Sequence, residues 1–281
     1  HYEGHPGLWY ATLAVVSLIS RAPAALAAAH AAIAAASIWL IAAASTFRRV
    51  EKTLLLANYF LVYEYAVVAR GHSTALLYAA LRARGRDGPL AVGAILGAMA
   101  NTSVHGLFLA GALGCEYLWN GAVRTDRFAR AGWGRTALGA ALCAAAAALS
   151  VATVWSPADL GEFGQRPTGE EMRDPARLAV QLLRALVPPF LPVDFSFPAS
   201  FAFPANIYDN GKRVWVCAAL LPVVLGCLGW AFRWHARFGA VVLGAACASA
   251  ALSFAVYPAA IRHLGMSWIG FAALAWIARA E

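Results

Sequence analysis

The chain has 281 residues, of which 61% are hydrophobic and only 13% are charged, and its net charge is +8. A soluble domain of this length would hold about a quarter charged residues, so the composition excludes an ordinary soluble protein. The basic residues stand between apolar runs, as in membrane proteins, so the positive charge does not indicate nucleic-acid binding. The five cysteines lie in or beside apolar runs without metal-ligand spacing, and we interpret them as packing residues.

Apolar runs along the whole chain predict an all-α, polytopic transmembrane bundle. A bilayer core about 30 Å thick needs about 20 helical residues, and a helix pairs every backbone amide within the segment. The nine predicted membrane segments are residues 24–44, 53–69, 72–81, 90–100, 106–119, 136–155, 214–232, 239–257 and 265–278. Segment 72–81 is too short to cross alone, and we expect Arg82 and Arg84 to extend it by reaching the interface.

The basic residues predict how the chain is oriented. Residues 8–20 are apolar but short, and if they form a helix along the outer membrane surface, most basic clusters fall on one side. Twelve basic residues then share that side: Arg48, Arg49, Lys52, Arg82, Arg84, Arg86, Arg124, Arg127, Arg130, Arg135, Arg233 and Arg237. The short connections on the other side hold only Arg21, Arg70 and Arg262. This bias marks the first side as cytoplasmic.

The prediction treats residues 1–281 as a single transmembrane domain, an internal part of a longer protein. Residues 1–23 form an outer interfacial loop and helix, and residues 156–213 form one long outer loop. Within that loop, Asp174–Pro175 is typical of a helix N-cap and first residue. Leucines then share one face, while Arg177, Gln181 and Arg184 share another. We expect an amphipathic helix lying on the membrane and ending at Pro188–Pro189.

Polar residues at membrane depth are costly and are therefore candidates for function. In the predicted orientation they gather on the outer side, in the stretches HYEGHPGLWY, YEYAVVARGH, NTSVH and IRHLG. Structural explanations stay open for some of them, because Glu64 and Arg70 can form an ion pair and His105 can cap a helix. The pair Arg262–His263 suits an anionic headgroup or a phosphate. The sequence holds no nucleotide-binding loop, zinc motif or Ser–His–Asp signature.

Three of these stretches resemble the GT-C type glycosyltransferases, which include protein O-mannosyltransferases and aminoarabinose transferases. HYEGHPGLWY resembles the H-P-P-L-W/Y-Y motif of their first outer loop, and His5 and Pro6 match it. YEYAVVARGH resembles a stretch that ends in A-R-x-Y in bacterial members; Arg70 matches it, but His72 stands where an aromatic residue is common. IRHLG resembles a later R-H-x-G motif, which Arg262 and His263 match, and the three motifs occur in the expected order.

The resemblance implies transfer of a sugar from a polyprenyl-phosphate-linked donor to an acceptor at the outer membrane face. It also implies an integral protein of the bacterial inner (plasma) membrane with its active face outside. It implies a catalytic acidic residue upstream of His1, so the general base is expected outside this chain, and a divalent metal is compatible with the reaction. The residues expected to bind the substrate phosphate are Arg262, His263, Arg70, His72 and His5. Supporting roles are expected for Glu3, Glu64 and His105. The expected partners are the lipid donor and membrane lipids, and we expect no metal ligands in this chain.

Two other functions stay open at this point. The second hypothesis is a transporter or flippase for a lipid-linked or small anionic substrate, although the polar residues favour one face rather than the midplane. Transporters usually show paired repeats and broken helices at the midplane, and the sequence shows no repeat. A non-catalytic membrane assembly protein is the third hypothesis, and in that case the outer polar residues would not converge.

Overall fold

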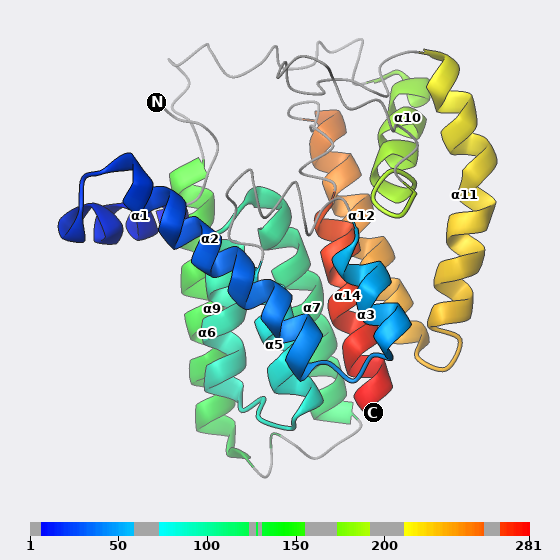
Figure 1. Ribbon diagram of the computed structural model, residues 1–281. Helices are drawn as coiled ribbons and strands as arrows, with labels where there is room; N and C mark the ends of the chain where they lie inside the picture. The colour runs from blue at the N-terminus through cyan, green and yellow to red at the C-terminus, as the bar shows by residue number, and fades with distance from the viewer. Residues whose placement is uncertain are drawn as a thin grey trace.

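A computed structural model of the protein describes residues 7–58, 73–123, 128, 131–154, 173–191, 211–255 and 265–281. All elements among these residues are helices, which confirms the all-α prediction (Figure 1). They are α1 (Gly7–Ile19), α2 (Pro23–Trp39) continued by the π-helix η1 (Leu40–Ala44), α3 (Arg49–Leu56), α5 (Ser73–Ala83), α6 (Pro89–Ala100), α7 (Val104–Val123), α9 (Trp133–Val154), α10 (Pro175–Leu186), α11 (Gly211–Ala231), α12 (Ala236–Ala255) and α14 (Met266–Ala280).

Four stretches of the described chain are long and apolar enough to cross a membrane, which indicates a membrane protein. They are Pro23–Ala44, Trp133–Thr153, Val214–Ala231 and Ala236–Ala255, and each matches a predicted segment. Helices α5, α6 and α14 are apolar but shorter, with 11, 12 and 15 residues. The predicted segment 53–69 overlaps only the end of the short α3, and residues 59–69 lie outside the described residues. The prediction of about nine membrane segments is therefore not confirmed.

Ion pairs fix the directions of the central helices. Arg82 in the last turn of α5 contacts Glu116 of α7, and it also contacts Glu281, which directly follows α14. Helices α5, α7 and α14 therefore run parallel and finish at one end of the bundle, which we call the paired end; their first residues lie at the opposite end, the start end (Figure 1). Arg237 at the beginning of α12 also pairs with Glu116, so α12 runs the other way.

Helices α6 and α9 rise from the paired end side by side. A Cβ atom on Gly93 would overlap the backbone of Gly139, so these two glycines let the helix backbones touch. Further along, Asn101 Nδ2 donates to the Ala146 carbonyl at 2.7 Å, and Ser150 Oγ donates to the Ala100 carbonyl at 2.7 Å. Buried side-chain donors thus satisfy carbonyls of the neighbouring helix where α6 ends.

Helix α10 begins as predicted and packs against two other helices. The Asp174 carboxylate accepts a hydrogen bond from the Ala176 amide at 2.9 Å, which confirms the N-cap. However, Gln181 and Arg184 are buried, with 6% and 7% of their surface exposed, while Leu178 is 37% exposed. Two residues of the predicted polar face, Gln181 and Arg184, are thus buried because α10 packs lengthwise against α12 and beside α11 (Figure 1). The position of this helix on the membrane surface stays a prediction.

The predicted N-terminal helix is present as α1, which packs on α2 at the edge of the bundle (Figure 1). Its position on a membrane surface stays a prediction. At the paired end, α2, α7, α9 and α11 carry exposed tryptophans at or near their ends. These residues are Trp39, Trp119, Trp133, Trp230 and Trp234. Such a belt is typical of the level at which a membrane protein meets the headgroups.

Candidate functional site

Most of the site residues predicted from the sequence lie outside the described residues. These are Glu3, His5, Glu64, Arg70, His72, Arg262 and His263. Their predicted roles stay predictions. His105 belongs to the described chain, where it is 2% exposed in the first turn of α7, and its ring lies edge-on to Phe108 at 6.5 Å between centroids.

The connection between α6 and α7 is buried and well ordered by hydrogen bonds. Ser103 Oγ accepts a hydrogen bond from the Gly106 amide at 2.9 Å, so Ser103, rather than His105, supplies the N-cap of α7. Asn101 uses its side-chain amide on the carbonyls of Gly97 and Ala146. The N-cap role considered for His105 therefore belongs to Ser103, and the His105 side chain is buried.

Helices α5, α7 and α14 all begin at the start end, as their ion-paired far ends require. In the sequence, His72 directly precedes Ser73, the first residue of α5. Arg262 and His263 stand just before Met266, the first residue of α14. Helices α5 and α14 also pack directly against each other. Two helices that follow separate predicted motifs in the sequence therefore pack together and begin at the same end of the bundle.

The paired end holds a buried charged cluster that the sequence did not predict as a site. Arg82 Nη1 lies 2.8 Å from Asp87 Oδ2, and Arg82 Nη2 lies 3.4 Å from Glu116 Oε2. Arg237 Nε lies 3.1 Å from Glu116 Oε1, and Arg237 also pairs with Glu281. The side chains of Arg82 and Glu116 are only 2% and 1% exposed. The prediction that Arg82 reaches out to the interface is therefore wrong, because nearby carboxylates hold its guanidinium inside.

Aromatic side chains complete the surroundings of this cluster. The Tyr117 hydroxyl donates to the Asp87 carbonyl at 2.8 Å, and the Arg82 guanidinium carbon lies 5.5 Å from the centre of the Tyr117 ring. The sequence did contain one signal, because Glu116 is the only acidic residue in the apolar segment 106–119. An ionisable residue within such a segment needs a partner or a function. The partners, from α5, α12 and the end of α14, could not be read from spacing.

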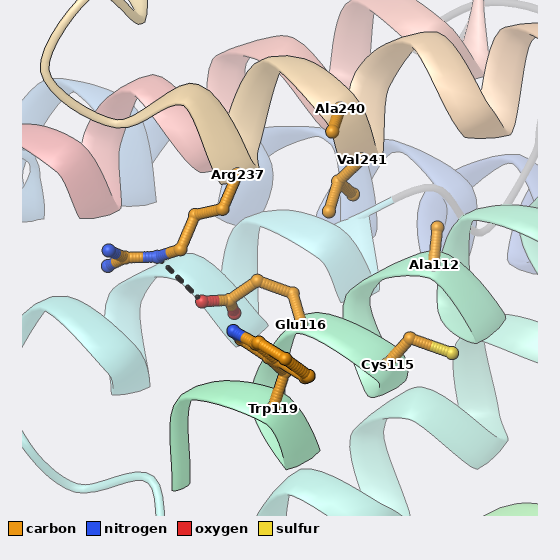
Figure 2. Close-up of a pocket in the computed structure, with 7 residues that line it drawn as sticks. All are labelled: Ala112, Cys115, Glu116, Trp119, Arg237, Ala240 and Val241. Carbon is orange, nitrogen blue, oxygen red and sulfur yellow. Dashed lines mark hydrogen bonds and ion pairs between the residues drawn. The ribbon is translucent and has the colours of Figure 1, made fainter. Parts of the chain in front are cut away.

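A shallow groove of about 310 Å³ opens beside the cluster, between α7 and α12 (Figure 2). Its walls are mostly apolar, and the Glu116–Arg237 pair is its charged element. The lining residues are Ala112, Cys115, Glu116, Trp119, Arg237, Ala240 and Val241. Because each charge here is engaged by an opposite charge, the arrangement is suited to tying helices together rather than to acid–base chemistry.

Metal binding has no support within the described part of the chain, which contains no group of three His, Cys, Asp or Glu residues placed to hold an ion. No protein-family model, curated protein or solved structure matches the chain. The functional assignment therefore depends on the residues and the geometry alone.

Proposed function

We propose that the protein transfers a sugar from a polyprenyl-phosphate-linked donor to an acceptor at the membrane face formed by the start end. One observation carries the proposal. Helices α5 and α14 pack side by side and begin at the same end, and each directly follows a predicted cationic motif in the sequence. Arg70 and His72 precede α5, and Arg262 and His263 precede α14.

The electrostatics of helix ends supports an anionic group at this place. Each helix carries a partial positive charge at its first turn, where backbone amides lack partners within the helix. The first turns of α5, α7 and α14 lie at the start end, and in the sequence Arg70 precedes α5 and Arg262 precedes α14. A leaving phosphate gains negative charge in the transition state, so fixed cations stabilise that state more than the bound substrate.

The test compares Arg70 and Arg262 with a control arginine in the full-length protein. Arg262→Ala and Arg70→Ala should each lower the rate of sugar transfer by about 100-fold or more, as loss of one charge-stabilising donor does. The control is Arg84→Ala, because Arg84 is an exposed arginine beyond the end of α5. Transfer should be measured with a labelled polyprenyl-phosphate sugar in detergent or nanodiscs. Unchanged transfer in Arg262→Ala and Arg70→Ala would contradict the proposed phosphate site.

A transporter or flippase is the second candidate. The short helix α10, which has 12 residues, favours it. Transporters build substrate sites at the midplane from helices that do not cross completely, and α10 places buried polar residues well inside the bundle. Uptake of an anionic lipid or solute by proteoliposomes, without a covalent product, would support this function over sugar transfer. An assembly role without chemistry would give neither activity.

A further inference from the structure

The connection between α11 and α12, which we call the hairpin turn (residues 232–235), is a tight turn at the paired end (Figure 1). Phe232 and Phe238 are buried, and their rings meet edge to face at 6.2 Å between centroids. The His235 amide donates to the Phe232 carbonyl at 2.8 Å, which closes the turn. Because these contacts hold the turn from the inside, Arg233 and Trp234 are left exposed on its outer surface.

Two tryptophans orient the Arg233 side chain. Its Nη1 donates to the Trp230 carbonyl at 2.9 Å, and its guanidinium carbon lies 4.8 Å from the centre of the Trp230 ring and 5.6 Å from that of Trp234. Cations at such distances are attracted to the face of an aromatic ring. No carboxylate among the described residues pairs with Arg233, whereas Arg237 pairs with Glu116 and Glu281. The Arg233 charge is therefore held in place without a counter-charge.

The hairpin turn joins two helices that are each long and apolar enough to cross a membrane. The Trp230 and Trp234 side chains are 70% and 81% exposed, and amphipathic rings of this kind favour the level of the lipid headgroups. Trp230 shares a face of α11 with Gly226 and Val223, four and seven residues earlier. Val223 is 52% exposed, and a Cβ atom on Gly226 would meet nothing within 4 Å. An open apolar strip thus leads from the turn along α11.

The charge of the whole sequence is concentrated in the segments around the helix ends of the paired end. Counted over the complete sequence, these segments are residues 45–52, 82–88, 116–135, 233–237 and 279–281. They hold 13 of the 22 basic residues and five of the 14 acidic residues, and the remaining nine basic residues balance nine acidic ones. The net charge of +8 therefore belongs to these segments. Basic segments beside membrane helices attract anionic headgroups.

We propose that Arg233, Trp230 and Trp234 bind the headgroup of an anionic phospholipid in the leaflet at the paired end. The Nε and Nη2 groups of Arg233 can donate together to two oxygens of the phosphate. An acyl chain then lies along the apolar strip of α11, beside the tryptophan rings. An anionic lipid is favoured over a zwitterionic one, because no carboxylate pairs with Arg233 and the paired end is basic. This site goes beyond the proposed sugar transfer, which concerns the opposite end.

The test compares binding of phosphatidylglycerol and phosphatidylcholine to the purified full-length protein, by native mass spectrometry and thermal unfolding. The wild type should bind phosphatidylglycerol preferentially. In Arg233→Gln we expect the affinity for phosphatidylglycerol to fall about tenfold or more, as loss of charged hydrogen bonds does, with phosphatidylcholine binding unchanged. The matched control is Arg84→Gln, because Arg84 is exposed at the same end. It should lose no more than about fivefold, the general attraction of one basic residue to an anionic surface.

Two further variants separate a headgroup site from a role in folding. Arg233→Lys keeps the charge but loses the paired geometry, and Trp234→Leu removes one ring that orients the guanidinium. Both should weaken phosphatidylglycerol binding, by about threefold for Trp234→Leu, with unchanged unfolding midpoints in detergent without lipid.

Four results would each overturn the proposal. They are equal losses in Arg233→Gln and Arg84→Gln, no preference of the wild type for phosphatidylglycerol, equal binding of water-soluble glycerol phosphate, and a lower midpoint of Arg233→Gln with wild-type lipid binding in Arg233→Lys and Trp234→Leu. The last result would assign Arg233 to the folding of the hairpin turn.

Discussion

Two regions of the molecule bury charged side chains, and they do so in different ways. At the paired end, arginines and carboxylates from α5, α7, α12 and the residue after α14 lie within salt-bridge distance of one another. On α10, the buried polar side chains, Gln181 and Arg184, come from one helix of 12 residues. The first arrangement joins many segments and closes on itself, which suits a structural role. The second buries polar side chains of one helix where it packs against α12 and α11.

Removing Arg82 should give the largest loss of stability and would test the structural role of the paired end. Arg82→Met leaves Asp87 and Glu116 buried without their main counter-charge, which costs about 3–5 kcal/mol. Thermal unfolding of the detergent-solubilised protein should show a large drop in midpoint. Arg84→Met is the control, because Arg84 is exposed. Equal midpoints for the two variants would show that the cluster does not hold these helices together.

Disturbing the contact between α6 and α9 should give the next largest loss of stability. Gly93→Ala places a methyl group into the backbone of Gly139, so the helices must separate, at a cost of about 1–3 kcal/mol. Gly111→Ala on α7 meets nothing within 4 Å and should be neutral or slightly stabilising, since alanine favours helix. The same unfolding measurement applies. If both alanines are tolerated equally, the close approach of α6 and α9 is not present in the folded protein.

The N-cap of α10 should contribute less to stability than the buried charged cluster or the contact between α6 and α9. Asp174→Ala removes the carboxylate that accepts the Ala176 amide, and loss of such an N-cap costs about 1 kcal/mol. Asp174→Asn keeps the cap and is the matched control. Hydrogen exchange of the α10 amides should rise in the alanine variant and stay low in the asparagine variant. Faster exchange in both variants would point to the charge of Asp174 instead of its hydrogen bond.

An ion pair at the surface should matter least, which sharpens the contrast with the buried cluster. Arg279 Nη2 lies 2.5 Å from Glu51 Oε1, but both side chains are about one-third exposed, at 36% and 35%. Arg279→Gln should therefore lower stability by less than about 1 kcal/mol, and added salt should remove most of that difference. A loss as large as that of Arg82→Met would show that α3 is part of the structural cluster.

Local sequence patterns predicted those features that depend on neighbours in the chain. The Asp174–Pro175 start of α10 is such a case, because a side chain and an amide two residues away complete the N-cap. Ser103 shows the limit of local patterns, because it caps α7 although His105 was also a candidate cap. Choosing between two polar residues in one turn depends on which side chain reaches the amide. The predicted motifs around Arg70 and Arg262 lie outside the described residues and stay predictions.

Composition and the length of the apolar runs determined that this is an all-helical chain with helices able to cross a membrane, because a helix satisfies its own backbone. Spacing along one helix also determined that Arg177, Gln181 and Arg184 share a face. Only the tertiary structure decided where that face turns. The partners of Arg82 and Glu116, and the helices α11 and α12 that pack against α10, come from segments far apart in the sequence. A periodic pattern identifies a polar face, but the helices packed around it decide whether that face meets water, lipid or the interior.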